Sequence, residues 1–252
     1  TFNVDDKINY MALSPDGNKL YAVDSGLGGT TNQGRIFVIN TSSGNTEGTP
    51  VNLGPGFPFQ IRLSPDGNRA YFAITQTAGS TITAGPNRIV VLDTSTSSPS
   101  VIKTIVIAGT STYGPVGLVL SPSGNNTYVT HRGLSRVDGY DNLTGSLISS
   151  VSNVGKSPYG LAVTPDGKKL CVSSFETVAV IDISNNSYAV LQIIPTGLTT
   201  NNSHTFITMA PDGSRVLVTD AGDSRIAVIQ FDPASGLPIP GIAYIQTTAK
   251  SS

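Results

Sequence analysis

The side chains with the clearest chemical potential are two histidines, His131 and His204, the only imidazoles in this chain of 252 residues. Imidazole changes its charge near neutral pH, so it serves in acid–base catalysis and as a metal ligand. His131 is followed by Arg132, and Asp220 lies a short distance beyond His204. These residues would suit metal binding or proton transfer, but no His-x-x-x-His or glutamate-containing metal motif accompanies them. We therefore favour ordinary loop and strand-end roles, and we predict no catalytic residue, metal or cofactor.

Two further residues complete a set of candidate binding residues. Arg62 lies in the otherwise apolar segment 60–63, where a charge must be paired or must reach water. A structural ion pair is the favoured interpretation, and an anion or carboxylate site is the alternative. Tyr159 directly precedes another apolar segment, 160–163. The full candidate set is His131, Arg132, His204, Arg62, Tyr159 and Asp220.

Other residue patterns argue against several function classes. Glu47 and Glu176 are the only glutamates, and most of the 16 acidic residues fall in turns, so a paired-carboxylate glycosidase is poorly supported. The acidic segments 5–6 and 220–223 lack the spacing of an EF-hand. The glycine-rich segment 26–29 lacks the lysine and the following helix of a phosphate-binding loop. No c-type haem motif is present.

The cysteine and charge content exclude further kinds of functional site and binding partner. Cys171 is the only cysteine, which rules out an internal disulfide and a cysteine-based metal site. Its apolar neighbours predict a small buried side chain. Only 12% of residues are charged and the net charge is −1, which argues against a basic surface for nucleic acid or anionic lipid. No apolar run approaches the ~18–20 residues that cross a bilayer. The chain starts at Thr1, as a processed product or an excised fragment would.

A recurring sequence motif predicts the strands and turns that must position these residues. A Ser/Thr/Ala-Pro-Asp/Ser-Gly sequence occurs five times, with each copy starting 50, 57, 43 or 46 residues after the previous one. Proline presets φ, aspartate caps the turn and glycine takes the left-handed position, so the phrase predicts a tight hairpin. The five copies are 14–17, 64–67, 121–124, 164–167 and 210–213.

Four strands are expected around each copy, because apolar and β-branched residues alternate on both sides of it. The first strands are expected at 10–13, 60–63, 117–120, 160–163 and 206–209, and the second at 19–23, 69–73, 127–130, 169–172 and 215–219. The third are expected at 35–39, 88–92, 135–140, 177–182 and 225–229. The more variable fourth, expected at a sheet edge, are 49–53, 102–107, 147–151, 189–193 and 241–245.

The segment Ser157-Pro158-Tyr159-Gly160-Leu161-Ala162-Val163-Thr164-Pro165-Asp166-Gly167 and its continuation through Val172 resemble the YVTN-type β-propeller repeat. Tyr128-Val129-Thr130 nearly spells the signature, and Val178–Asp182 is similar to its next strand. The resemblance covers essentially the whole chain. It implies a propeller of the kind found in surface-layer proteins and in secreted or periplasmic proteins, and it says little about activity.

The expected fold is therefore an all-β propeller of four-stranded antiparallel blades. One domain is expected over 1–252, with repeats at about 5–54, 55–109, 110–155, 156–198 and 199–252. A part of a six- or seven-bladed propeller is the alternative, and a two-sheet sandwich is a rival that does not explain the recurring hairpin. Thr1–Val4 aligns with a fourth strand. It is expected to fasten the ring, to be the remnant of an upstream blade, or to pair with another chain.

The leading functional hypothesis is a non-enzymatic extracellular or cell-surface module for binding, adhesion or assembly, with the periplasm as the alternative location. Its expected partner is a protein or carbohydrate at the cell surface, or a second copy joined through the N-terminal strand. The candidate residues are expected near one mouth of the central channel. The long polar loops 24–34 and 74–87 would display binding residues on one rim. The alternatives are a lactonase-like hydrolase that uses the channel mouth, and a structural subunit of a filament or surface layer joined through terminal strands.

Overall fold

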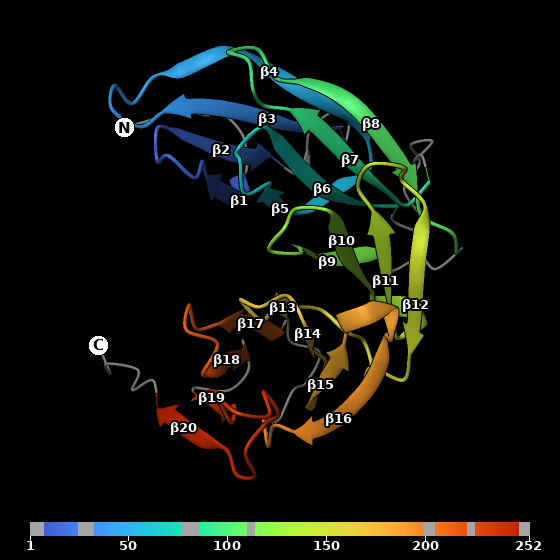
Figure 1. The fold of residues 1–252 in the computed structure, drawn as a ribbon. Helices are drawn as coiled ribbons and strands as arrows, with labels where there is room; N and C mark the ends of the chain where they lie inside the picture. Colours follow the sequence, from blue (N-terminus) through green and yellow to red (C-terminus); the bar gives the residue numbers. More distant parts are fainter. Residues whose placement is uncertain are drawn as a thin grey trace. The chain divides into compact units, whose positions relative to one another are not determined.

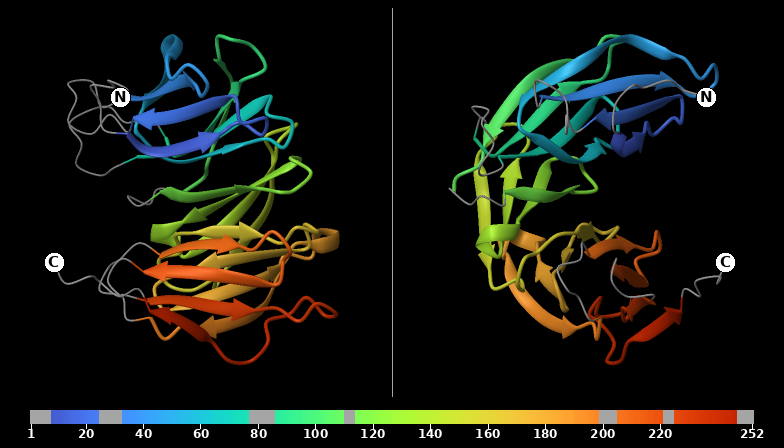
Figure 2. Two further views of the ribbon diagram at one scale, coloured as in Figure 1. Left: turned by 90° about the vertical axis from the view of Figure 1, so that its left-hand side faces the viewer. Right: turned by 180° about the vertical axis from the view of Figure 1, so that it is seen from behind.

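The protein is described by a computed structural model that covers residues 8–24, 33–76, 86–109, 114–198, 205–220 and 225–246. In these residues the strands form five four-stranded antiparallel sheets, each with its strands in chain order (Figures 1 and 2). Two short 3-10 helices, η1 (Arg132–Leu134) and η2 (Ser184–Asn186), are the only helical elements within the described ranges. The predicted all-β repeat of four strands is confirmed.

The strands of the five sheets are as follows. The first two sheets contain β1 (Ile8–Leu13), β2 (Lys19–Asp24), β3 (Gln33–Asn40) and β4 (Thr46–Pro55), then β5 (Phe57–Leu63), β6 (Arg69–Thr75), β7 (Arg88–Asp93) and β8 (Ser100–Val106). The third contains β9 (Pro115–Leu120), β10 (Asn126–His131), β11 (Arg136–Asp141) and β12 (Leu147–Ser152). The last two contain β13 (Leu161–Val163), β14 (Lys169–Ser173), β15 (Thr177–Asp182) and β16 (Ala189–Pro195), then β17 (Thr205–Met209), β18 (Arg215–Asp220), β19 (Arg225–Gln230) and β20 (Ala243–Gln246).

The chain divides into two compact units, Thr1–Leu118 and Val119–Ser252, with the boundary inside β9. The predicted single domain with its five repeat boundaries stays a prediction. The N-terminal segment 1–4 and most of the two long loops, at 25–32 and 77–85, lie outside the described residues.

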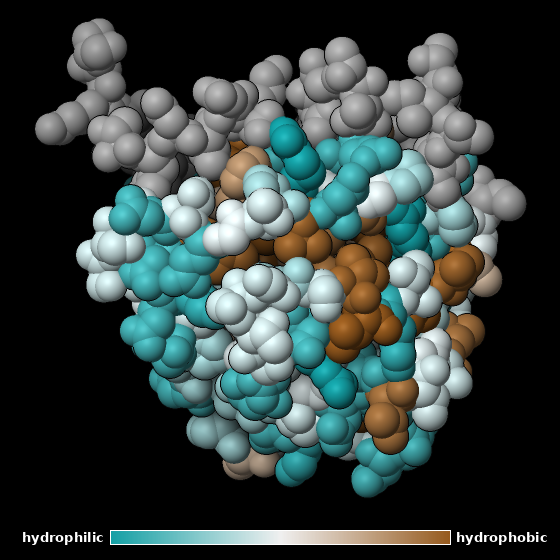
Figure 3. All heavy atoms as spheres, turned by 90° about the horizontal axis from the view of Figure 1, so that it is seen from above, coloured by the Kyte–Doolittle hydropathy of each residue, from teal (hydrophilic) through white to brown (hydrophobic). Residues whose placement is uncertain are grey.

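Apolar core clusters are shared between neighbouring sheets. In the first unit, buried side chains of β2, β3, β5 and β6 pack together, with Tyr21, Ile36 and Phe72 at most 1% exposed. In the second unit, two clusters lie along β14 and β15. The fourth strand of each sheet is an edge strand, as predicted, and it keeps apolar side chains such as Ile102 and Val106 exposed. Figure 3 shows one face on which apolar residues gather among polar ones.

The hairpin between the first and second strands is held by its own side chains. Ser14 Oγ donates to Asp16 Oδ1 (2.5 Å) and accepts from the backbone N–H of Lys19 (2.9 Å). The second repeat has the same pair of bonds at equivalent residues. The hydrogen bond from Ser14, with those from Asn18, lowers the pKa of Asp16. The fifth repeat has Ala210 in the serine position, and Asp212 there accepts from Ser214 instead.

The residue that follows the third strand of each sheet forms hydrogen bonds that hold this turn in place. In the first three repeats it is polar, and its side chain donates to the carbonyl of the turn glycine at 2.7–2.8 Å. These bonds run from Thr41 to Gly17, from Thr94 to Gly67 and from Asn142 to Gly124. In the last two repeats the residue is apolar, Ile183 or Phe231, and only its backbone N–H bonds the turn.

The turn glycine also contacts the previous repeat. A Cβ added to Gly213 (φ +73°) would lie 3.1 Å from Cδ of Pro165, and one added to Gly67 would lie 3.1 Å from Cδ of Pro15. At Gly17 (φ +75°) such a Cβ would meet nothing within 4 Å. The turn therefore favours glycine for its backbone in every repeat, and at Gly67 and Gly213 for its packing as well.

We expect Gly213→Ala to lower the free energy of unfolding by more than Gly17→Ala. The positive φ alone costs about 1–2 kcal/mol for a residue with a Cβ, and Gly213 adds the close contact with Pro165. Chemical denaturation of both variants measures the two effects, with Gly17→Ala as the control for strain alone. Equal losses in the two variants would contradict the inter-repeat contact.

The residue at the position of Tyr21 in the second strand packs near the residue that follows the third strand of the next repeat, here called the fastening position. Tyr21 in the first repeat is 1% exposed, and its hydroxyl forms a side-chain hydrogen bond with Thr94. The equivalent of Tyr21 in the fourth repeat is Cys171, and the equivalent of Thr94 in the fifth is Phe231; both lie in one core cluster. The phenyl ring thus supplies the volume that the cysteine lacks.

The expectation for Cys171 as a small buried side chain is confirmed. It is 0% exposed, and burial raises the pKa of its thiol to about 12. Between the third and fourth repeats both residues are large, Tyr128 and Ile183, and they share a cluster.

Candidate functional site

A buried acid–base pair lies at the end of β10. His131 closes that strand and pairs in register with Arg136 at the start of β11. Its side chain is 0% exposed, and Nε2 lies 3.0 Å from Oδ2 of Asp138. The distance is that of an ion pair, although the ring N–H is not aligned for a regular hydrogen bond, and Nδ1 has no hydrogen-bond partner among the described residues.

Asp138 is the centre of this cluster. The guanidinium of Arg136 donates to its Oδ2 through Nη2 (2.9 Å) and Nε (3.2 Å), and Ser150 Oγ donates to its Oδ1 (2.7 Å). Burial raises the pKa of Asp138, but the contacts with His131 and Ser150 and the charge of Arg136 outweigh this, so its pKa lies below the usual value. The carboxylate also raises the pKa of Tyr140, after the larger effect of burial.

The register of the third sheet produces the cluster. Asp138 stands opposite Val129 on β10 and opposite Ser150 on β12, so the carboxylate meets partners from all three strands. The equivalent third-strand residues in the other repeats are apolar: Phe37, Val90, Ala179 and Ala227. Sequence reasoning missed Asp138, Arg136 and Ser150. The signal that could have found them is an aspartate in a strand position that is otherwise apolar.

A cationic and aromatic surface cluster lies beside this buried pair. Phe175, in the loop between β14 and β15, is half-buried, and the Cζ of Arg132 and the Nζ of Lys156 each lie 6.0 Å from its ring centroid. The backbone N–H of Phe175 donates to the carbonyl of Lys156 (3.2 Å), which fixes the two loops to each other. Two positive charges are thus held on one ring at the surface.

Tyr159 links the neighbouring repeats beneath this surface. It is 4% exposed, and its ring meets Phe206 edge-on at 5.4 Å between centroids. Its carbonyl accepts a hydrogen bond from the hydroxyl of Thr130, the neighbour of His131 (3.0 Å). Tyr159 therefore packs and positions the segment rather than presenting its ring to solvent.

The structure brings three of the six predicted candidates into one region. His131, Arg132 and Tyr159 all lie around the end of β10 in the second unit. His204 lies outside the described residues, and Asp220 is the last residue of β18. Arg62 lies in β5 of the first unit.

Arg62 is half-buried, and its Nη1 donates to the carbonyl of Ile61 (2.9 Å). Burial lowers the pKa of its guanidinium. It forms no ion pair with any carboxylate in the part of the chain that the structure describes.

The arrangement limits the available chemistry. His131 and Asp138 have no exposed surface through which they could reach a bound substrate. Among the described residues, no group of three or more His, Cys, Asp or Glu side chains is placed to hold a metal ion. Arg132, Lys156 and Phe175 are accessible in this region, as is Glu176, and the two cations beside the ring suit binding of an anionic partner.

Comparison with known proteins gives structural relatives. No family model and no curated protein sequence matches the chain. A functionally unknown protein from Desulfotomaculum acetoxidans is similar, with a TM-score of 0.74 and 18% identity over 97% of this chain and 71% of the other. Hydrazine synthase from Kuenenia stuttgartiensis is similar with a TM-score of 0.69 and 19% identity; the match covers 94% of this chain and 65% of that one, less than two thirds.

The likeness is one of fold. At such low identity it carries no activity from either relative. A search of the described residues for an apolar helix long enough to cross a membrane found none.

Proposed function

We propose that this chain forms a YVTN-type β-propeller, or a part of a larger one, that acts as a non-enzymatic binding module outside the cell or at its surface. The five sheets with one recurring hairpin, and the similarity to solved structures over nearly the whole chain, support the propeller. The repeat phrase around Tyr128 and Pro165 supports the family.

The observation that carries the binding role is the contrast between buried and exposed groups at the end of β10. His131 and Asp138, which have the chemistry for proton transfer, are fully enclosed, whereas Arg132 and Lys156 beside them are partly or fully exposed. An active site needs its acid or base within reach of the substrate. A binding surface needs only accessible side chains of the right charge.

The partner that best fits this surface is a carboxylate-bearing polysaccharide. Guanidinium and ammonium groups bind carboxylates, and the Phe175 ring holds both cations in place so that less conformational freedom is lost on binding.

We expect the double variant Arg132→Ala/Lys156→Ala to bind polygalacturonate about 5- to 30-fold more weakly than the wild-type protein, since each exposed ion pair contributes about 0.5–1 kcal/mol. Binding to immobilised polysaccharide, measured by biolayer interferometry at low salt, tests this. The double variant Lys168→Ala/Arg215→Ala is the control, because it removes two exposed cations at the hairpin end of the same unit. Equal loss in both variants would indicate unspecific charge attraction, and turnover of a defined substrate would contradict a non-enzymatic role.

A further inference from the structure

The apolar contact between neighbouring repeats is built from the same two sheet faces each time. One face carries the positions of Tyr21 and Ile36 and packs on the following repeat; it is called the forward face here. The other face carries the position of Met11 and packs on the preceding repeat; it is called the rear face. The core clusters join repeats 1 and 2, repeats 3 and 4, and repeats 4 and 5 in this way. Each repeat therefore presents one forward face and one rear face.

The rear face of the first repeat is uncovered. Met11 is 63% exposed. Its equivalents in the second, third and fourth repeats are at most 3% exposed: Ile61, Leu118 and Leu161. Leu13 is 56% exposed, lies on the same face two residues along β1, and stands opposite Leu20 of β2. An apolar surface that the later repeats bury is thus exposed in the first.

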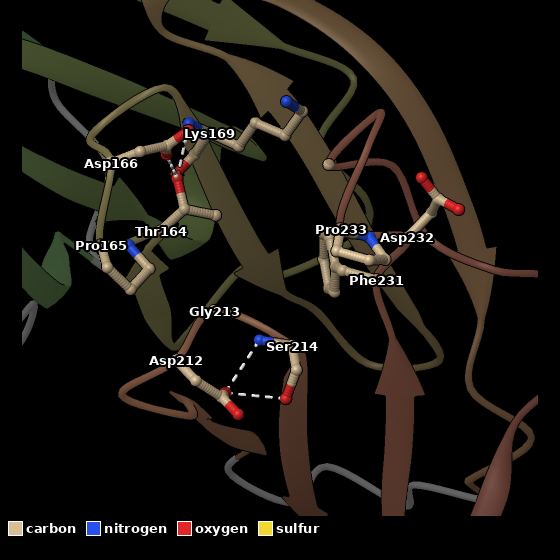
Figure 4. A pocket seen from close by; sticks show the side chains of 11 residues that line it. Thr164, Pro165, Asp166, Lys169, Asp212, Gly213, Ser214, Phe231, Asp232 and Pro233 are labelled. Carbon is tan, nitrogen blue, oxygen red and sulfur yellow. Dashed lines mark hydrogen bonds between the residues drawn. The ribbon is translucent and has the colours of Figure 1, made fainter.

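The hairpin of the first repeat lacks the corresponding contact. In the second, fourth and fifth repeats the turn glycine lies close to a proline of the preceding repeat, as Gly213 does to Pro165 (Figure 4). A Cβ added to Gly17 would meet nothing within 4 Å. The proline at the same position of the fifth repeat is Pro211, which is exposed. The chain therefore holds both parts of this contact, unpaired, in its first and last repeats.

The forward face of the fifth repeat is uncovered as well. The residues at the position of Ile36 are at most 1% exposed in the first four repeats: Ile36, Ile89, Val137 and Val178. In the fifth repeat their equivalent, Ile226, is half-buried, as is Leu217 at the position of Tyr21. The strand register places Ile226 in one row with Phe206 and Ile245, which are 44% and 50% exposed.

We propose that copies of this chain associate head to tail, with the forward face of the fifth repeat in one copy packed on the rear face of the first repeat in a second copy. The two faces are the two halves of the contact that recurs between repeats, so a second copy carries the partner that each face lacks. Pro211 of one copy would then lie against Gly17 of the other.

Burial of the exposed apolar side chains on both faces provides the free energy of this association. A head-to-tail contact either closes into a ring of copies or continues as a filament. The inference goes beyond the proposed function, because none of these residues belongs to the cluster of Arg132, Lys156 and Phe175.

Substitutions at exposed positions test each face separately. Met11→Arg places a charge in the rear face, and Ile245→Arg places one in the forward face. Size-exclusion chromatography with light scattering, over a dilution series, should show the wild-type mass rising above the 26.1 kDa of one chain as the concentration increases. Each variant should stay at the mass of one chain. Ile102→Arg, at a 50% exposed site on the edge strand β8, is the control and should associate as the wild type does.

An equimolar mixture of the two variants is the sharpest measurement. Met11→Arg retains an intact forward face and Ile245→Arg retains an intact rear face, so the two chains can form one contact and no second. The mixture should therefore reach the mass of two chains and stop there. Circular dichroism verifies that each variant is folded, and Leu13→Arg and Thr208→Arg, at two further exposed positions of the same faces, replace any variant that is not.

Four results would each overturn the proposal. Wild-type protein that stays a single chain is the first: binding of an apolar dye would then leave the faces to a different protein, and no dye binding would indicate that they meet within one chain. The second is association of either variant alone, which would indicate that one face pairs with itself. The third is a mixture that forms no pair. The fourth is loss of association in Ile102→Arg, which would indicate unspecific apolar adhesion.

Discussion

Replacement of Asp138 by alanine is expected to lower the free energy of unfolding by about 3–5 kcal/mol, the cost of breaking a buried ion pair from one side. The carboxylate is 0% exposed and accepts hydrogen bonds from Arg136 and Ser150, with His131 in contact at 3.0 Å. Its loss leaves the buried imidazole and the guanidinium without their anion. Urea denaturation followed by circular dichroism measures the change.

Asp141→Ala is the matched control on the same strand. Asp141 caps the turn after β11 through the backbone N–H (2.7 Å) and hydroxyl (2.9 Å) of Thr144, and all of this lies near the surface. We expect a loss of about 1 kcal/mol there, the net value of an ordinary hydrogen bond. A loss at Asp138 no larger than this would contradict the central role of its carboxylate.

The same carboxylate makes stability depend on pH. The pKa of Asp138 is lower in the folded protein than its unfolded value of about 3.9. Its contribution is therefore fully present above the unfolded pKa and is lost as the pH falls through the folded pKa. The stability difference between wild type and Asp138→Asn should shrink as the pH falls from 7 to about 3. A difference that stays constant over this range would contradict the assignment.

Replacement of Cys171 by tyrosine is the second large effect that we expect. The new ring would compete with Phe231 for one space in the core, and overpacking of this kind costs about 1–3 kcal/mol. Phe231→Thr alone should cost about 3–5 kcal/mol, the range for truncation of a buried phenyl ring. Together the two changes recreate the arrangement of Tyr21 and Thr94, in which a tyrosine hydroxyl bonds a threonine.

The double variant should therefore lose less free energy of unfolding than the sum of the two single losses, and the difference, the coupling free energy, should be about 1–3 kcal/mol. A double-mutant cycle from denaturant unfolding measures it. Cys171→Tyr combined with Val178→Ala serves as the control, because Val178 belongs to the same cluster but not to the fastening position. Additive losses in the test pair would show that Phe231 does not compensate for the cysteine.

The strands could be predicted because each repeat carries its own local signals. Proline, aspartate and glycine specify one turn, and alternating apolar residues specify the strands on both sides of it. The predicted third strand began at Ser135, but β11 begins at Arg136 because Ser135 takes a left-handed conformation (φ 50°) after η1. The predicted ring arrangement of the sheets depends on contacts distant in sequence, which repeat spacing does not encode.

The candidate site was predicted less completely. His131 and Arg132 were found by residue type, but only the three-strand register shows that His131 is enclosed with Asp138. Phe175 and Lys156 were not found, since a phenylalanine and a lysine in separate loops give no joint signal in one sequence. A cavity between the hairpins that contain Asp166 and Asp212 was missed for the same reason, because two different repeats form it.

The hairpin and the opposite loops of each repeat differ in how much length variation they accept. The first strand ends and the second begins with the same separation in every repeat: Leu13 to Lys19, Leu63 to Arg69, Leu120 to Asn126, Val163 to Lys169 and Met209 to Arg215. The connections from second to third strand vary, from Ser173 to Thr177 up to Thr75 to Arg88. A residue inserted in a hairpin would disturb two repeats, whereas a longer loop adds only a small closure entropy. Foreign peptides should therefore be graftable at 133–134, where the residues are exposed and the scaffold is retained.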